Sequence, residues 1–251
     1  MKLALLSDIH ANLQALQACL GHAEQQGASQ FALLGDMVGY GAEPVPVMDR
    51  ILQMARDGAV VLRGNHDAMA LNPPQKSELL GESTAAWTHA QLTAEHLAFM
   101  AALPLTVRLQ SCFLVHASAD APEDWRYVDD ERSAGASLAA AATADPDVRY
   151  VFGGHVHQQT LYYKGSRGGL MAFSPTAGVP IPMPAHRHWI ATVGSVGQPR
   201  DGQPSAMYAM FDLSHARLTF HRVAYDHMAA AAAVRRAGLP EYFAKRLEEG
   251  R

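Results

Sequence analysis

The chain begins Met1-Lys2-Leu3-Ala4-Leu5-Leu6-Ser7-Asp8-Ile9-His10-Ala11-Asn12, a short apolar run that ends in polar residues. Residues 2–7 have the length and continuous apolar character of a buried strand. From Asn12 onward, apolar residues recur at positions 13, 16, 20 and 23 and stop at Gly27, which is the spacing of an amphipathic helix. The N-terminal segment therefore predicts a strand, a loop and a helix in that order.

Two more units of the same kind follow. Residues 31–34 repeat the strand signal, and residues 45–55 have a helical pattern that begins with prolines in its first turn. Residues 59–62 give a third strand, which ends at Gly64. Three such units in succession imply parallel strands joined by right-handed crossovers. In sheets of this kind the loops at the carboxyl ends of the strands form the functional site, so candidate residues are expected there.

The remainder of the chain mixes helices with short strands. A helix is expected from a cap at Ser83 or Thr84 through Met100, and another from a cap at Asp129 or Asp130 to about residue 142. Two helices are expected at the end of the chain, over residues 227–237 and 241–247. Strands are expected over residues 107–109, 113–115, 150–152, 160–163, 170–173, 189–193, 207–211 and 218–223.

The predicted fold is α/β (α+β), with two mixed β-sheets packed as a sandwich and flanked by helices in a single domain over residues 1–251. The early strands form a parallel set and the late strands an antiparallel set, and each set is expected to form one of the sheets. The proline-rich segment 175–184 is interpreted as a rigid connector between strands, with a lid over the site as the alternative.

The composition excludes several classes of protein. A net charge of −4 over 251 residues argues against sequence-independent binding of duplex nucleic acid, which needs a basic surface. Two cysteines, Cys19 and Cys112, offer neither a disulfide framework nor a thiolate zinc site and fit a reducing, cytoplasmic location. No secretory signal or membrane span is expected. The thirteen histidines exceed the five or six expected at an average usage of roughly 2%, which points to imidazole chemistry.

Metal-binding residue types follow almost every early strand. Residues i and i+2 of an extended segment point the same way, so an Asp-x-His or His-x-His pair can present two ligands to one point. Taken singly, an Asp-x-His pair is also explained by loop capping, and a lone His by a buried core imidazole. Chance would place the two longest blocks together in roughly one chain in ten thousand of this length, so the set favours a metal site. The blocks are Asp8-x-His10, Gly35-Asp36, Gly64-Asn65-His66-Asp67, His116 and Gly154-His155-Val156-His157.

In this order the blocks resemble the calcineurin-like metallophosphoesterase superfamily, whose pattern is Asp-x-His, Gly-Asp, Gly-Asn-His-Asp/Glu, a lone His and Gly-His-x-His. The resemblance covers residues 8–157 and implies a two-sheet sandwich with a dinuclear metal centre at the strand ends. It implies that Asp36 bridges the two metals and that His66 is the general acid beside the leaving group. The other implied ligands are Asp8, His10 and His157 for one metal, and Asn65, His116 and His155 for the other.

The implied centre suits an anionic phosphate ester. Against two divalent cations, the carboxylates of Asp8 and Asp36 and one hydroxide leave a surplus of about +1. The expected nucleophile is the metal-bridging hydroxide, since the sequence has no Gly-x-Ser-x-Gly elbow and no P-loop. Manganese is the expected metal, with iron, zinc, nickel or magnesium as alternatives. Asp67 either orients His66 in catalysis or caps the helix that follows.

Three residues are candidates for substrate binding. Arg63 precedes the Gly-Asn-His block and resembles the phosphate-gripping arginine of the phosphoprotein phosphatases, so it is a candidate clamp on a phosphoryl oxygen. Those enzymes read Gly-Asp-x-Val-Asp-Arg-Gly in the second block, whereas this chain has Gly39 and Tyr40 in place of the acid and the arginine. Tyr40 either stacks on a nucleobase or packs on its own loop, and Arg200 either meets a distal phosphate or pairs with Asp201.

Residues 193–201 and 238–241 look like the small bacterial branch of the superfamily, which includes phosphodiesterases and hydrolases of diadenosine tetraphosphate. The predicted function is a dinuclear-metal-dependent phosphoric-ester hydrolase, either a phosphodiesterase or an asymmetric dinucleoside polyphosphate hydrolase, acting on a small phosphate ester or nucleotide. A serine/threonine phosphoprotein phosphatase is the alternative enzyme. A non-catalytic binding scaffold of the same fold is disfavoured, because every ligand position and His66 are filled. The sequence leaves the oligomeric state open.

Overall fold

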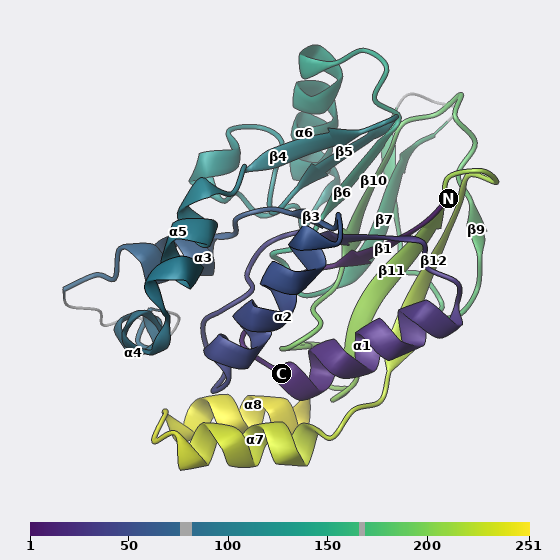
Figure 1. Cartoon of the computed structure of the whole chain (residues 1–251). Helices are drawn as coiled ribbons and strands as arrows, with labels where there is room; N and C mark the ends of the chain where they lie inside the picture. The colour runs from purple at the N-terminus through teal and green to yellow at the C-terminus, as the bar shows by residue number, and fades with distance from the viewer. Residues whose placement is uncertain (76–81, 166–168) are drawn as a thin grey trace.

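The computed structural model describes residues 1–75, 82–165 and 169–251, in which helices lie outside two β-sheets (Figure 1). The helices are α1 Leu13–Gln25, α2 Pro44–Arg56, α3 Asn65–Leu71, α4 Ala85–Gln91, α5 Ala94–Ala102, α6 Glu131–Ala144, α7 His227–Arg236 and α8 Glu241–Glu249. The strands are β1 Lys2–Leu6, β2 Gln30–Leu33, β3 Val60–Val61, β4 Thr106–Leu109, β5 Cys112–Val115, β6 Tyr150–Gly153, β7 Gln159–Lys164, β8 Leu170–Phe173, β9 Ile181–Pro182, β10 Trp189–Val193, β11 Ala206–Asp212 and β12 Arg217–Val223.

Both sheets are mixed, which confirms the predicted fold class. Sheet A has the strand order β3-β2-β1-β11-β12-β9, and sheet B has the order β4-β5-β6-β10-β7-β8. In sheet A, β1, β2 and β3 run parallel as the strand–helix units predicted, while β11 pairs antiparallel with both β1 and β12. In sheet B, β10 pairs parallel with β6 and antiparallel with β7.

The prediction that early and late strands form separate sheets is wrong. β11 and β12 extend sheet A beside β1, and β4, β5 and β6 share sheet B with late strands. The β1–β11 pairing runs from Lys2 opposite Asp212 to Leu5 opposite Ala209. β1 is a buried central strand, so hydrogen-bonding groups on both of its edges need partners. Strand patterning shows which faces are buried and carries no information on which distant strand supplies the second edge.

The residues of β1 show how the layers form. Leu3 and Leu5 belong to the core between the sheets, whereas Ala4 and Leu6 belong to the core beneath α1 and α2. On the outer side of sheet B, α6 packs on β8 and β10. β1 is continuously apolar because both of its faces are covered. In Figure 1, α1 and α2 lie in front of sheet A, and α7 and α8 lie below them.

The helix predicted over residues 84–100 is interrupted. A break at Thr93 separates α4 from α5, and the Thr93 hydroxyl accepts a hydrogen bond from the backbone N–H of His96 at 3.2 Å. Thr93 therefore starts a new helix by capping it. Asp130 caps α6 as predicted, since its carboxylate accepts a backbone N–H at 2.7 Å.

The segment 175–184 connects the two sheets. It contains β9, which pairs with β12 at the edge of sheet A, and it follows β8 at the edge of sheet B. The backbone N–H of Gly178 donates to the carbonyl of Phe220 at 2.8 Å. These bonds agree with the interpretation of the segment as a connector.

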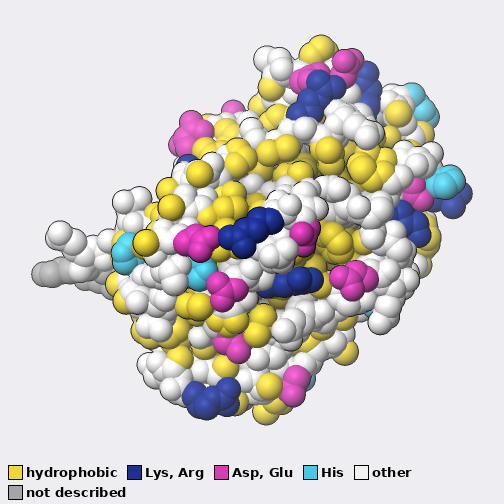
Figure 2. Space-filling model, viewed as in Figure 1, with side chains coloured by type: hydrophobic (Ala, Val, Ile, Leu, Met, Phe, Trp, Pro, Cys, Tyr) yellow, Lys and Arg dark blue, Asp and Glu magenta, His cyan; other side chains and the backbone are white. Residues whose placement is uncertain are grey.

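The surface carries mixed charge on the face shown in Figure 2, where Lys and Arg side chains lie among Asp and Glu side chains. This distribution accords with the net charge of −4. Within the described part of the chain, no helix combines the length and apolar character needed to cross a bilayer.

Candidate metal centre

The predicted metal ligands converge from loops that are far apart in the sequence. Four of these loops follow β1, β2, β5 and β6, and the fifth contribution comes from the first turn of α3. β1 and β2 are parallel, as are β5 and β6, so their carboxyl ends lie at matching edges of the sheets. The predicted ligands that the structure brings together are Asp8, His10, Asp36, Asn65, His116, His155 and His157.

Five of these residues have a left-handed backbone. The φ angle is +54° for Asp8, +49° for His10, +53° for Asp36, +68° for His155 and +57° for His157. Each such non-glycine residue costs about 1–2 kcal/mol, and strain of this kind is concentrated at functional sites. The two i, i+2 pairs therefore converge through turns, whereas the sequence analysis placed them on extended segments.

The first cluster consists of Asp8, His10 and His157, all buried. Nε2 of His10 lies 3.2 Å from Nε2 of His157. Oδ1 of Asp8 lies 3.3 Å from Nε2 of His157 and 3.8 Å from Nε2 of His10. The ligand atoms of the three residues lie within 4.8 Å of one another, so one ion placed among them can contact all three.

The second cluster consists of Asp36, His116 and His155, whose ligand atoms also lie within 4.8 Å of one another. Oδ2 of Asp36 is 3.4 Å from Nε2 of His116. Oδ1 of Asn65 is 3.0 Å from the same nitrogen, so the structure places Asn65 with this cluster.

Asp36 lies between the two clusters. Its Oδ2 atom is 3.8 Å from Nε2 of His10 in the first cluster and 3.4 Å from Nε2 of His116 in the second. Its other oxygen, Oδ1, accepts a hydrogen bond from the backbone N–H of His66 at 2.8 Å. One carboxylate oxygen is thus held by the backbone while the other faces both clusters.

Backbone carbonyls orient three of the imidazoles. In each ring Nδ1 lies within hydrogen-bond distance of a carbonyl oxygen, which only accepts, so Nδ1 carries a proton and Nε2 faces the cluster. The pairs are His10 with Val38 at 3.2 Å, His116 with Leu34 at 2.8 Å and His157 with Gln198 at 2.6 Å.

The donor set fits divalent metal ions. Oδ1 of Asp8 is buried and has no hydrogen-bond partner among the described residues, which is costly for a carboxylate unless a cation contacts it. Burial lowers the pKa of His10 and lowers that of His155 to about 4, which favours the neutral imidazole, the form that can bind a metal. At His116 burial also favours the neutral form, but the Asp36 carboxylate raises the pKa to about 9, so a metal bound there must displace a proton.

His66 lies beside the clusters with its side chain 8% exposed. Its ring is 5.1 Å from the ring of His10 and 4.3 Å from that of Tyr40. Burial lowers its pKa, and the Asp36 carboxylate opposes that effect. Gly39 lies directly against it, because a β-carbon at position 39 would be 2.8 Å from Nδ1 of His66. The position that carries a carboxylate in the phosphoprotein phosphatase pattern is therefore a neighbour of His66 in this chain as well.

Asp67 braces the loop that follows β2. In the part of the chain that the structure describes, no hydrogen bond joins Asp67 to His66. The alternative that Asp67 is the cap of a helix that follows it is wrong, because α3 already begins at Asn65 with Gly64 as its N-cap, and Asp67 lies in its first turn. The carboxylate of Asp67 accepts four backbone N–H groups, those of Asp36, Met37 and Gly64 at 2.9 Å each and that of Val38 at 3.2 Å.

Tyr40 is 8% exposed. Its ring lies 4.6 Å from that of His10 and 5.2 Å from that of Phe243. This burial favours the packing alternative over stacking on a nucleobase. The guanidinium of Arg63 donates to the carbonyl of Ala101 at 3.2 Å, which holds it against the end of α5.

Arg200 does not pair with Asp201 in the structure. Asp201 instead forms a two-bond ion pair with Arg222. The guanidinium of Arg200 donates to Oε1 of Gln198 at 2.8 Å and lies 5.8 Å from the centre of the Tyr40 ring.

Two aromatic residues beside the second cluster were missed by the sequence analysis. The ring of Tyr127 stacks on that of His155 at 4.2 Å and its side chain is 51% exposed. The ring of Trp125 lies 5.9 Å from that of His116. The available signal was their position in the loop between the His116 strand and the next helix.

Comparison with known proteins agrees with this geometry. Residues 1–216 match the calcineurin-like phosphoesterase superfamily domain. The chain is 30% identical over 261 residues to the uncharacterized protein MJ0912 of Methanocaldococcus jannaschii, covering 99% of this chain and 98% of that protein. A metallophosphoesterase from Sphaerobacter thermophilus superposes with a TM-score of 0.88 at 32% identity, covering 100% and 99% of the two chains. The hypothetical protein PH1004 from Pyrococcus horikoshii OT3 superposes with a TM-score of 0.76 at 19% identity, covering 100% and 98%.

A two-sheet sandwich with two buried Asp/His clusters at the strand ends, together with these matches, defines a metallophosphoesterase, which is a hydrolase. The chain belongs to the calcineurin-like phosphoesterase superfamily.

Proposed function

We propose that this protein hydrolyses small phosphoric diesters or asymmetric dinucleoside polyphosphates. The observation that carries the proposal is the placement of Asp36. One carboxylate oxygen faces His10 and His116, one from each cluster, and the other holds the backbone of His66. The proposed acid and both metal sites are thus parts of one rigid unit, as an in-line displacement at phosphorus requires.

The residues proposed to hold the metals are those named by the sequence, with Asp36 shared between the clusters. When bound, two divalent cations supply positive charge for the phosphoryl oxygens and lower the pKa of a water molecule. The mixture of imidazole nitrogens with carboxylate and amide oxygens suits manganese, iron, zinc and nickel alike. Manganese is the metal proposed, and metal analysis of the purified protein tests that choice.

His66 is proposed to donate a proton to the leaving oxygen. Its side chain is slightly exposed at the site, and its backbone is fixed by Asp36. Burial lowers the pKa of the His66 imidazole, and a phosphate anion beside it would raise that pKa and so favour the protonated form, which is the form that donates.

The residues around His66 favour a hydrolase of small diesters or dinucleoside polyphosphates over a phosphoprotein phosphatase. Gly39 leaves His66 without a carboxylate at Nδ1, and Tyr40 stands where the phosphoprotein phosphatase pattern has an arginine. Beside His155, the exposed ring of Tyr127 offers a flat surface for an organic ester group such as a nucleobase.

The proposal is tested with manganese-loaded protein and three substrates, bis-p-nitrophenyl phosphate, diadenosine tetraphosphate and a phosphoserine peptide. We expect kcat/KM for at least one of the first two to exceed that for the peptide by about tenfold or more. A preference for the peptide would replace the proposal with the phosphatase alternative. Full activity after exhaustive chelation would overturn metal dependence.

A further inference from the structure

Two arginines from different parts of the chain converge on the side chain of Gln198. Arg200 donates to Oε1 of Gln198 through one terminal nitrogen at 2.8 Å and through Nε at 3.3 Å. Arg246, on α8, donates to the same oxygen at 3.1 Å. Two positive groups thus share one neutral acceptor, and Arg246 was not singled out in the sequence analysis.

Neither arginine forms an ion pair within the described ranges, although both are half-buried. Burial and the charge of Arg200 lower the pKa of the Arg246 guanidinium. Two like charges held together without a counterion are unfavourable, and a bound anion would relieve the repulsion. Nearby carboxylates are taken by other arginines: Asp201 by Arg222, Glu241 and Glu248 by Arg235, and Glu249 by Arg251.

The arginine pair adjoins the metal centre through two residues. The backbone carbonyl of Gln198 accepts from Nδ1 of His157, while its side chain accepts from both arginines. The ring of Tyr40 lies 4.3 Å from the ring of His66 and 5.8 Å from the guanidinium of Arg200. Tyr40 is therefore a neighbour of both the proposed acid and one arginine of the pair.

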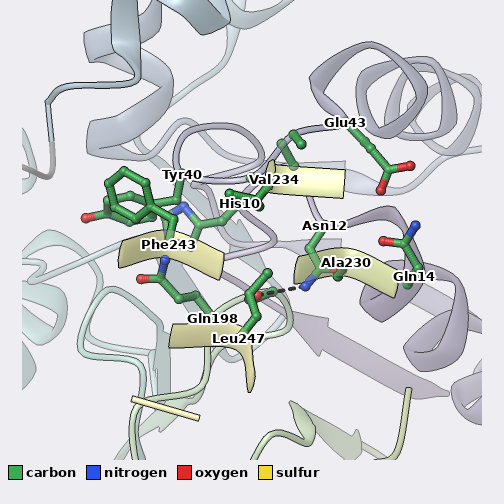
Figure 3. A pocket seen from close by; sticks show the side chains of 14 residues that line it. His10, Asn12, Gln14, Tyr40, Glu43, Gln198, Ala230, Val234, Phe243 and Leu247 are labelled. Carbon is green, nitrogen blue, oxygen red and sulfur yellow. Dashed lines mark hydrogen bonds between the residues drawn. The ribbon is translucent and has the colours of Figure 1, made fainter. Parts of the chain in front are cut away.

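The C-terminal helices hold Arg246 in this position. Phe243 and Leu247 of α8 pack in one apolar cluster with Tyr40. Figure 3 shows the rings of Tyr40 and Phe243 side by side in the pocket beneath these helices, with Gln198 next to them. α8 follows the segment 1–216 that matches the superfamily domain, so Arg246 is supplied from outside the matched region.

We propose that Arg200 and Arg246 form a subsite for a second phosphate group of the substrate, one that is not cleaved. The substrate class that fits is a nucleoside or dinucleoside polyphosphate, in which a second phosphate lies next to the one that is cleaved, as Arg200 lies next to Tyr40 and the proposed acid. A pair of guanidinium forks matches the oxygens of a phosphate in both charge and shape. The assignment rests on the proposed function for the cleaved phosphate and adds the recognition of its neighbour.

The first experiment compares substrates with one and several phosphates. Arg200→Gln and Arg246→Gln are measured as manganese-loaded proteins on bis-p-nitrophenyl phosphate and on diadenosine tetraphosphate. We expect the ratio of kcat/KM for the tetraphosphate over the diester to fall by about tenfold or more in each variant, the effect of one lost charge-assisted contact. Lys245→Gln is the matched control, since Lys245 is an exposed cation on the same helix and should leave the ratio unchanged.

The second experiment measures binding directly by calorimetry of the manganese-loaded protein, with inorganic tripolyphosphate and inorganic phosphate as probes. We expect the wild-type preference for tripolyphosphate to shrink in both arginine variants and to persist in Lys245→Gln. Metal content and melting temperature are compared to show that the variants remain folded and loaded. If the folded arginine variants prefer tripolyphosphate over phosphate as strongly as the wild-type protein does, the proposed subsite is wrong. The protein could also prefer tripolyphosphate through both arginines and yet hydrolyse none of the esters. That result would support the subsite and reject the proposed function.

Discussion

A β-carbon at Gly39 would lie 2.8 Å from Nδ1 of His66. Gly39 also has a φ angle of +88°, a conformation that side chains rarely adopt. The imidazole of His66 therefore occupies its position because residue 39 has no side chain.

Gly39→Ala should displace His66 and lower kcat on bis-p-nitrophenyl phosphate by about ten- to a hundredfold while metal content stays at the wild-type level. The backbone strain alone should lower the free energy of unfolding by about 1–2 kcal/mol. Gly58→Ala is the matched control, because Gly58 has a φ of +95° with nothing within 4 Å of an added β-carbon. Equal kcat for the two variants would show that the contact at residue 39 does not position His66.

His66→Ala should keep both metals and lose about 10²–10⁴-fold in kcat, the usual contribution of a positioned acid. The loss should be larger for an ester with a poor leaving group than for one that releases p-nitrophenolate, because the latter needs less protonation. Steady-state kinetics on such a pair of substrates measures the difference. An identical loss for both leaving groups would contradict the role of acid.

Asp36→Ala should weaken metal binding at both clusters, since one oxygen of Asp36 faces His10 and His116 together. Metal analysis after dialysis should find well under two ions per chain in this variant. Asp57→Ala, which removes an exposed carboxylate after α2, serves as the control. Two tightly retained ions in Asp36→Ala would remove the bridging assignment.

Asp67→Asn should lower the free energy of unfolding by at least about 3 kcal/mol, because one oxygen is replaced by an amide that cannot accept and buried N–H groups lose their partners. Oδ1 accepts the N–H groups of Met37 and Val38, and Oδ2 accepts those of Asp36 and Gly64, so the variant leaves two N–H groups without a partner. Urea denaturation measures the change. A loss below about 1 kcal/mol would show that the carboxylate does not brace the loop.

Protonation of His221 should lower the free energy of unfolding at acid pH. Burial, with a smaller effect of His22, lowers the pKa of His221 to about 4 in the folded chain, against about 6.5 unfolded. The unfolded chain therefore binds more protons between these values, so stability falls as the pH drops from about 6.5 to about 4. His221→Gln should flatten this part of the stability profile, and His186→Gln, at an exposed position, should not. An unchanged slope in His221→Gln would contradict the assignment.

Local patterns in the sequence were sufficient to predict three strand–helix units, the two-sheet class and the candidate ligands. The reason is that most of the predicted ligands lie in the loop just after an apolar strand, as Asp8 follows β1 and His155 follows β6, so strand and predicted ligand lie within a few residues of each other. Superfamily membership followed from the order of these short blocks, and the match over residues 1–216 confirms it.

Tertiary structure alone decided how strands far apart in the sequence pair and what several side chains contact. β11 lies beside β1, Asp67 binds the loop after β2, and Phe243 buries Tyr40. Arg200 and Arg246 meet at Gln198 only because α8 folds back onto the metal-site loops. Helix and strand periods describe which face of an element is buried, whereas the partner of that face is set by contacts between residues far apart in the chain.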